Sequence, residues 1–345
     1  MLALRLYGPG DLRLDEVPIP EINENEILLK TDAAAVCGTD IRMWQNGQKG
    51  VDAAHPLILG HEFAGTIVKV GKNVPFYEEG MQVGMQPNIG CGICDRCVDG
   101  KFHLCDDYRA FGINMDGAFA EYVKIPAEAV TRGNLMVLPK GVSAAEAAVT
   151  EPLSCAYNGF TKCFVKPGEY AMVVGAGPIG FCHAMLLHMA GAKVLMNDIQ
   201  AERLADVQKK LPYISIYSGD DLPGFVKEWT RGRGLDVAIT ACPVPAVQAA
   251  VLPLMNYGGR VNYFGGIPAA KQPVAIDTNQ IHYHELYVTG STRSSIAQFR
   301  KTLEFVAQGL LDVHTMITDR YSLSEALNAF ENARQAKGIK HVIDF

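Results

Sequence analysis

Four cysteines crowd one short stretch of the chain, CGICDRCVDGKFHLC at residues 91–105. Their spacing is C-x2-C-x2-C-x7-C, and short C-x2-C steps are typical of tetrahedral zinc sites with four thiolate ligands. Iron–sulfur ferredoxins use a tighter last step followed by proline, which this stretch lacks. A closed four-sulfur site leaves no position for a substrate. The pattern therefore predicts a structural zinc, with a redox switch or an iron–sulfur site as the alternatives, at Cys91, Cys94, Cys97 and Cys105.

A second set of donors is scattered along the chain. Cys37 lies in VCGTD, His61 and Glu62 lie in GHEFAG, and Glu151 lies in TEPLS. Each has an ordinary structural interpretation, since a lone cysteine is usually a small core residue and Glu151 before Pro152 could be a helix N-terminal charge. Together they offer sulfur, nitrogen and oxygen donors. Catalytic zinc sites combine three such ligands with an open fourth position.

A glycine-rich turn, G-x-G-x-x-G at Gly175, Gly177 and Gly180, follows the apolar run AMVV and precedes a helical pattern. Asp198 closes the next expected strand. Strand, glycine turn, helix and acidic residue in this order are the dinucleotide-binding fingerprint. The turn presents helix N–H groups to a pyrophosphate, and the acid accepts hydrogen bonds from the adenosine ribose. The carboxylate would repel a 2′-phosphate, so the sequence predicts NAD.

The elements that must position these residues change in type near residue 150. Before it, short strands such as 26–36 and 62–71 alternate with glycine and proline turns. After it, strands and helices alternate, which predicts a parallel sheet covered on both faces. Helices are expected at 201–211, 244–255, 295–312 and 322–336, the last capped by Ser322 or Ser324.

Length and composition narrow the function classes. The chain has 345 residues, about half of them apolar, and a formal net charge of −6 without a basic run, which argues against nucleic-acid or anionic membrane partners. We expect no transmembrane span. Nine cysteines are an odd number and fit a reducing compartment, so a cytoplasmic protein is predicted.

The order of the motifs carries a resemblance. CGTD, GHEFAG, the four-cysteine loop, GAFAEY, EPLS and GAGPIG follow one another over nearly the whole chain. In this the sequence resembles the zinc-dependent medium-chain dehydrogenase/reductase family. The resemblance implies an α/β fold with a GroES-like, β-rich catalytic domain at 1–152 and 290–345. A Rossmann domain with a doubly wound parallel sheet is implied at 153–289.

Within that family, glutamate at position 151 is similar to the polyol branch, which includes sorbitol, xylitol and iditol dehydrogenases, and to threonine and butanediol dehydrogenases. That branch implies Cys37, His61 and Glu62 as ligands, with a zinc-bound water held by Glu151. In other branches Glu151 replaces Glu62, and the sequence leaves both arrangements open. The resemblance implies two zincs per chain, NAD, and a homo-oligomer, either a dimer or a tetramer. The cofactor-binding residues implied are Gly175, Gly177, Pro178, Ile179, Gly180, Asp198 and Arg203.

Further residues receive expected roles. Thr39 is expected to take the proton of the alcohol. Arg42 stands where the family often has a histidine that ends a proton relay, and an arginine does not shuttle protons near neutral pH. Arg42 is expected instead to bind an anionic group of the substrate or to be a surface cation. Arg293, in GSTRSS, occupies the place of a substrate-binding arginine in the polyol branch. Trp44 and Phe111 are expected either to line the pocket or to pack in the core.

The function that results is reversible hydride transfer between NAD and a secondary alcohol, most specifically a polyol/ketose pair. Butanediol, threonine and polyol-phosphate dehydrogenases are the alternatives among enzymes. Outside enzymes, the alternatives are a nucleotide-binding protein that has lost catalysis and a redox sensor built on the four-cysteine loop.

Overall fold

The computed structural model describes residues 1–345, which form two compact units. The first comprises Met1–Ser154 and Ser294–Phe345, and the second comprises Cys155–Arg293. None of the helices has the length and apolarity needed to cross a bilayer.

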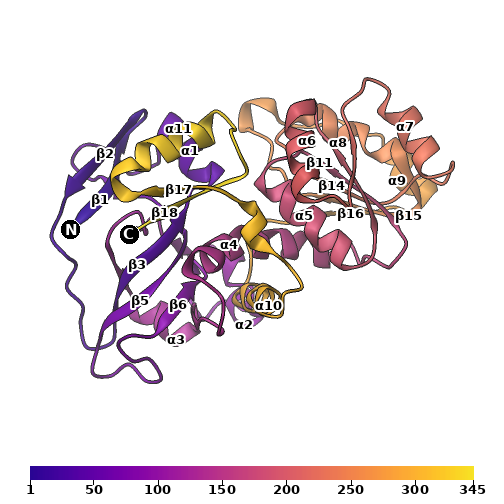
Figure 1. The fold of residues 1–345 in the computed structure, drawn as a ribbon. Coiled ribbons are helices and arrows are strands. Elements are labelled where there is room, and N and C mark those ends of the chain that lie inside the picture. Colours follow the sequence, from indigo (N-terminus) through magenta and orange to yellow (C-terminus); the bar gives the residue numbers. More distant parts are fainter. The chain divides into compact units, whose positions relative to one another are not determined.

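The first unit is built on a seven-stranded sheet in the order β10-β6-β5-β3-β18-β17, with β9 also paired to β3. The C-terminal strand β18 lies between β3 and β17, so the end of the chain returns to the middle of the N-terminal sheet (Figure 1). The strands of this sheet are β3 (Ile27–Ala35), β5 (Glu62–Val70), β6 (Gln82–Met85), β9 (Tyr122–Ile125), β10 (Leu135–Val137), β17 (Ile317–Ser322) and β18 (Lys340–Asp344).

A smaller three-stranded sheet and six helices complete this unit, and its core joins residues from both segments of the chain, including Phe63, Phe119 and Phe330. The small sheet has β1 (Leu2–Gly8), β2 (Asp11–Glu16) and β4 (Leu57–Ile58), and β7 (Asn88–Ile89) pairs with β8 (Arg109–Ala110). The helices are α1 (Gly38–Asn46), α2 (Asp95–Val98), α3 (Ala127–Arg132), α4 (Ala144–Thr161, which continues into the second unit), α10 (Ile296–Ala307) and α11 (Ala326–Arg334).

The second unit has a six-stranded sheet in the order β13-β12-β11-β14-β15-β16, and every pairing in it is parallel. Counted within the unit, this is the 3-2-1-4-5-6 order of a Rossmann fold. The strands are β11 (Tyr170–Val174), β12 (Lys193–Asn197), β13 (Ser215–Tyr217), β14 (Leu235–Thr240), β15 (Met255–Tyr263) and β16 (Tyr287–Gly290). The helices between them are α5 (Pro178–Met189), α6 (Ala201–Lys210), α7 (Leu222–Trp229), α8 (Pro245–Ala250) and α9 (Thr278–His284).

Two helix predictions needed correction. The helix expected at 244–255 ends at Ala250 and is followed by a 3-10 turn at Leu252–Leu254, because Pro253 has no N–H to continue the α-helix. The interpretation of Glu151 as a helix N-terminal charge is wrong, because α4 begins at Ala144 and Glu151 lies in its interior. Ser322 caps the 3-10 turn Leu323–Glu325 that precedes α11, in a capping box with Glu325, and the N-cap position of α11 itself is Glu325.

His183 on α5 is fully buried in the second unit and neither ring nitrogen has a hydrogen-bond partner. Its ring lies edge-on to Phe264, 5.0 Å between centroids, and close to Gly159, where a Cβ would come within 3.1 Å of the ring. Burial lowers the pKa of His183 to about 3. The imidazole is therefore neutral in the folded protein.

The burial of His183 predicts that the folded protein loses stability in acid. Between pH 6.5 and 3 the unfolded chain takes up a proton at residue 183 that the folded chain does not, so stability falls as the pH falls. We expect His183→Leu to reduce the slope of the unfolding free energy in that window by up to about 1.4 kcal/mol per pH unit. Urea unfolding at a series of pH values measures this. His188→Leu, on the exposed side of the same helix, is the control, and an equal effect of both variants would contradict the assignment.

Candidate metal centres and dinucleotide site

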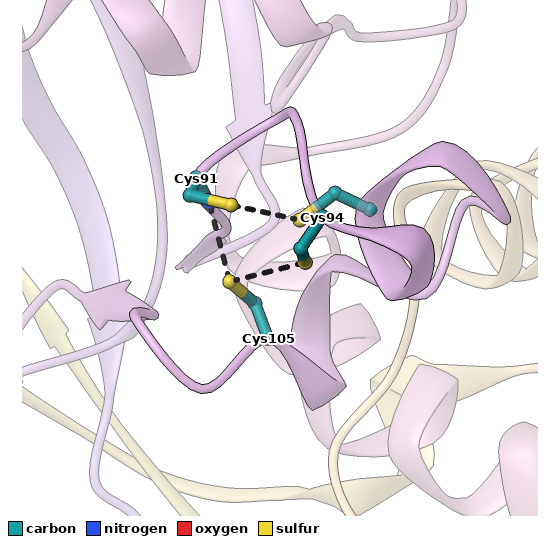
Figure 2. Close-up of side chains that lie close together, drawn as sticks. Cys91, Cys94 and Cys105 are labelled. Carbon is teal, nitrogen blue, oxygen red and sulfur yellow. Dashed lines mark hydrogen bonds between the residues drawn. The ribbon is translucent and has the colours of Figure 1, made fainter.

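The four sulfurs of the cysteine loop converge on one point. The sulfurs of Cys91, Cys94, Cys97 and Cys105 all lie within 4.8 Å of one another. Cys91 Sγ is 4.0 Å from Cys97 Sγ, and Cys94 Sγ is 3.8 Å from Cys105 Sγ. A tetrahedron with zinc–sulfur bonds of about 2.3 Å has edges of about 3.8 Å. Figure 2 shows the side chains of Cys91, Cys94 and Cys105 turned toward one another, and the loop fits a tetrahedral zinc.

The backbone of the loop is shaped for this convergence. A Cβ at Gly90 would lie 2.5 Å from Cys97 Sγ, and Gly92 has a φ of 85°, so both positions suit glycine. Backbone N–H groups of Ile93 and Cys94 lower the pKa of Cys91, which favours the thiolate that a metal requires. Arg132 at the end of α3 donates to the carbonyls of Gly90 and Cys91. These two hydrogen bonds of Arg132 were not predicted from the sequence.

The second cluster brings together Cys37, His61 and Glu62, whose donor atoms lie within 4.8 Å of one another. Cys37 caps α1 directly after β3, and His61 and Glu62 lie where β5 begins. The antiparallel register sets Ala35 opposite Glu62, so the end of one strand meets the start of the other. A thiolate, an imidazole and a carboxylate in this arrangement are a donor set that suits zinc.

Asp40, which was not predicted from the sequence, contacts both Cys37 and His61. Its Oδ2 accepts from the Cys37 N–H at 2.9 Å, and its Oδ1 lies 3.4 Å from His61 Nδ1. Burial lowers the pKa of His61, but Asp40 and Cys37 together raise it well above its usual value. A carboxylate behind a ligating imidazole fixes the orientation of the ring. The C-x-x-D spacing of a capping box was the available signal.

Lys340 on β18 is the second residue that the sequence analysis missed. It is fully buried, with Nζ 2.7 Å from Glu62 Oε1 and 2.5 Å from Glu62 Oε2. It also donates to the carbonyl of Val36 at 2.9 Å. Burial opposes the ammonium form, but the negative charges of Glu62, Cys37 and Glu151 raise the pKa of Lys340. Lys340 is therefore the cationic partner of Glu62 in this cluster.

Glu151 lies on α4, is buried, and is close enough to act on the charge of Lys340. Three residues further along the helix, Ser154 donates to the Glu151 carbonyl at 2.6 Å and its Oγ lies 2.7 Å from Ser294 Oγ. Gln86 donates to the Ser294 carbonyl at 2.8 Å. This buried polar network fixes the turn of α4 that carries Glu151.

The remaining candidates of the first unit lie on or near α1. Arg42 is exposed, and its Nη2 lies 3.5 Å from Thr39 Oγ1. Trp44 packs edge-on against Phe330 at 6.0 Å between ring centroids. Phe111 is fully buried and edge-on to Phe63, so in this structure it contributes to the core.

Arg293 is the last residue of the second unit and has a φ of 54°, which is unusual for a side chain that is not glycine. Asn158 on α4 donates to the carbonyls of Thr292 and Arg293 at 3.1 and 3.0 Å. The side-chain amide therefore holds the turn in its left-handed conformation.

The glycine-rich turn between β11 and α5 has the geometry that a dinucleotide needs. Gly175 has a φ of 112°, and a Cβ at Gly180 would lie 1.8 Å from the Gly175 carbonyl oxygen. Gly177 caps α5, with Pro178 and Ile179 in its first turn. Helix and strand therefore approach closely, and the first N–H groups of α5 are left for an anion.

Asp198 and Arg203 flank this turn. The carboxylate of Asp198 accepts from the Ala176 N–H at 2.7 Å and from the Gln200 N–H at 3.0 Å. Arg203 Nε donates to the Ala176 carbonyl at 3.0 Å. Burial lowers the pKa of Arg203 despite the charge of Asp198. Both charged residues thus hold the backbone of the turn next to the expected cofactor.

Two family models match the chain. The alcohol dehydrogenase GroES-like domain covers residues 23–135, and the zinc-binding dehydrogenase model covers residues 178–308. The sorbitol dehydrogenase of Bacillus subtilis is 30% identical over 342 residues, which are 98% of this chain and 94% of that protein. The chain belongs to the zinc-dependent medium-chain dehydrogenase/reductase family.

Other relatives are consistent with this membership. An L-threonine 3-dehydrogenase of Bacillus velezensis is 33% identical over 331 residues, covering 94% of this chain and 92% of that protein. A solved structure described as a zinc-binding dehydrogenase from Sinorhizobium meliloti bound to NADP matches with a TM-score of 0.87 and 29% identity, covering 100% and 99% of the two chains. The predicted fold class is confirmed, and the chain is a zinc- and nicotinamide-dependent oxidoreductase.

Elemental analysis should find close to two zincs per chain. Cys37→Ala should lose one zinc and the activity while the fold persists. Cys97→Ala should lose the other zinc and lower the melting temperature, because binding energy at a structural site is also folding energy. Cys163→Ala, a buried cysteine of the second unit, should retain both zincs. Unchanged zinc content and melting in Cys97→Ala would refute the structural zinc.

Proposed function

We propose that this dehydrogenase oxidises a polyol to a ketose with NAD, reversibly. The observation that carries the proposal is Arg293, a non-glycine residue held in a left-handed backbone by Asn158. Such strain is kept where the position of a side chain serves function. A planar guanidinium can donate to two neighbouring hydroxyls at once. The similarity to a sorbitol dehydrogenase along 98% of this chain supports the same substrate class.

In the mechanism that we propose, Cys37 and His61 bind the catalytic zinc, with Glu62 or Glu151 as the third protein ligand. When bound, zinc polarises the substrate oxygen and the nicotinamide accepts the hydride. Asp40 holds His61 in orientation, and Arg293 orients the polyol. Gly175, Gly177 and Gly180, with Pro178 and Ile179, shape the turn that binds the pyrophosphate.

Thr39 is the group that we propose takes the proton of the substrate hydroxyl. It lies two residues after Cys37, and its own hydroxyl proton can pass on to water. Arg42 Nη2 lies 3.5 Å from Thr39 Oγ1, and because a guanidinium has N–H donors and no acceptor, Arg42 can donate to Thr39 and cannot accept the proton. The relay therefore differs from one that ends at a histidine.

NAD is the preferred cofactor in this proposal, because the Asp198 carboxylate at the end of β12 would repel a 2′-phosphate. The Sinorhizobium meliloti structure was solved with NADP, so the choice needs a direct test. Asp198→Asn keeps an oxygen that can accept from the Ala176 N–H and removes the charge. We expect wild type to have a higher kcat/KM with NAD than with NADP. In Asp198→Asn the ratio of kcat/KM for NAD to kcat/KM for NADP should fall at least tenfold. Faster wild-type turnover with NADP at equal concentration would overturn the assignment.

L-Threonine is the main alternative substrate, because a threonine dehydrogenase is 33% identical to this chain. A polyol phosphate is the second, since Arg42 is a further cation near Thr39 and guanidinium pairs well with phosphate. The exposure of Arg42 leads us to favour the free polyol.

A substrate panel separates these possibilities. Sorbitol, xylitol and galactitol, their phosphorylated counterparts, butanediol and L-threonine are assayed for NADH production in wild type, Arg293→Ala and Arg42→Ala. We expect Arg293→Ala to lower kcat/KM for the best polyol roughly tenfold to a hundredfold through lost charge-assisted hydrogen bonds. Arg42→Ala should matter little. A large loss in Arg42→Ala confined to phosphorylated substrates would make this a sugar-phosphate enzyme, and preference for threonine would remove the polyol proposal.

We also propose a cytoplasmic homo-oligomer, a dimer or a tetramer. None of the nine cysteines forms a disulfide, which supports a reducing compartment. The strand β16 forms one edge of the second unit's sheet and presents exposed Tyr287. An exposed strand edge can pair with another chain. Light scattering of the purified protein would give the mass in solution.

A further inference from the structure

The catalytic metal cluster contains more negative charge than a divalent ion can offset. Cys37, which binds a metal as a thiolate, and Glu62 lie in the cluster, and Asp40 lies 3.4 Å from His61 Nδ1. Glu151 is near enough to act on the charge of Lys340, and all three carboxylates are buried. Two positive charges from a metal leave a negative surplus. Buried charge without a partner is costly, so the cluster needs another cation. Lys340 is in contact with it.

The contacts of Lys340 show that it serves as the counter-ion of Glu62. Its side chain is 2% exposed, its Nζ lies within 2.7 Å of both oxygens of Glu62, and it also donates to the Val36 carbonyl next to Cys37. The register that places Val342 opposite Ala35 delivers Lys340 to the Val36–Cys37 corner. The ammonium is held by a central strand and has no exposed route to solvent.

We propose that Lys340 is a positioning residue that fixes the carboxylate of Glu62 and offsets part of the surplus negative charge, and thereby limits how tightly the catalytic zinc is held. A fixed cation close to the metal opposes binding of a divalent ion through Coulomb repulsion. It also occupies oxygens of Glu62 that could otherwise bind the metal. Lys340 thereby leaves more of the positive charge of the ion for a substrate oxygen. The inference rests on the assignment of the catalytic zinc to Cys37 and His61, which Cys37→Ala tests separately.

The test is the affinity for the zinc that Cys37→Ala loses, measured by competition with a chromophoric chelator. We expect Lys340→Met to bind this zinc at least tenfold more tightly than wild type. The zinc-free form of the same variant should melt at a lower temperature, since Glu62 is then buried without its partner. At saturating zinc and substrate its kcat should fall at least tenfold. A lysine needed only for folding predicts the opposite for zinc, with affinity and stability lost together.

Two further variants keep the test decisive if Lys340→Met does not fold without zinc. Glu62→Gln and the double variant Glu62→Gln/Lys340→Met both lack the buried carboxylate, and the double variant buries a neutral pair. We expect the double variant to bind zinc at least tenfold more tightly than Glu62→Gln alone. Equal or weaker affinity in the double variant would overturn the proposal.

Two controls separate charge at the cluster from other effects. Lys340→Arg keeps the cation and should retain the wild-type zinc affinity within severalfold. Lys30→Met removes an exposed positive charge from β3 in the same sheet and should leave zinc affinity unchanged. If Lys30→Met raised the zinc affinity as much as Lys340→Met does, the net charge of the protein would explain the result, and the proposal of a specific role for Lys340 would be wrong.

Discussion

The metal cluster depends on the two antiparallel ladders that β3 forms with β5 and with β18. In them Ala35 lies opposite Glu62 on one side and opposite Val342 on the other. Since side chains follow the strand register, this single position brings Cys37, Glu62 and Lys340 together from three distant parts of the chain. A slip of one residue would turn Lys340 or Glu62 to the other face of the sheet, and the cluster would lose either its ligand or its cation.

Surplus negative charge explains why so much of the surroundings is polar and buried. Asp40 is held by the Cys37 N–H and faces His61, and Glu62 is held by Lys340. Buried carboxylates are tolerated only when each has such a partner. The network of Gln86, Ser154 and Ser294 holds the backbone of Glu151, because Ser154 donates to its carbonyl. The orientation of each donor is therefore fixed by the protein itself.

The dinucleotide turn follows a different principle. Its glycines work through local backbone geometry, because Gly175 needs its φ of 112° and Gly180 must lie against the Gly175 carbonyl. Asp198 and Arg203 then hold the turn by contacts to Ala176. All of these residues lie within one strand–helix–strand unit. A site of this kind can be read from spacing, because neighbours in space are near neighbours in the sequence.

The sequence by itself determined the parallel sheet, the four-cysteine loop and the dinucleotide turn, because these follow from hydrophobic period and short-range spacing, and the GroES-like domain was implied by the resemblance to a known family. It proposed Cys37, His61 and Glu62 but missed Asp40, and it missed Lys340 although Lys340 shares a strand face with buried Val342. Only the tertiary structure decided that a lysine near the C-terminus neutralises Glu62, and that Phe111 packs in the core. The reason is physical: strand pairing between residues hundreds of positions apart sets these contacts, and local sequence does not encode the partner.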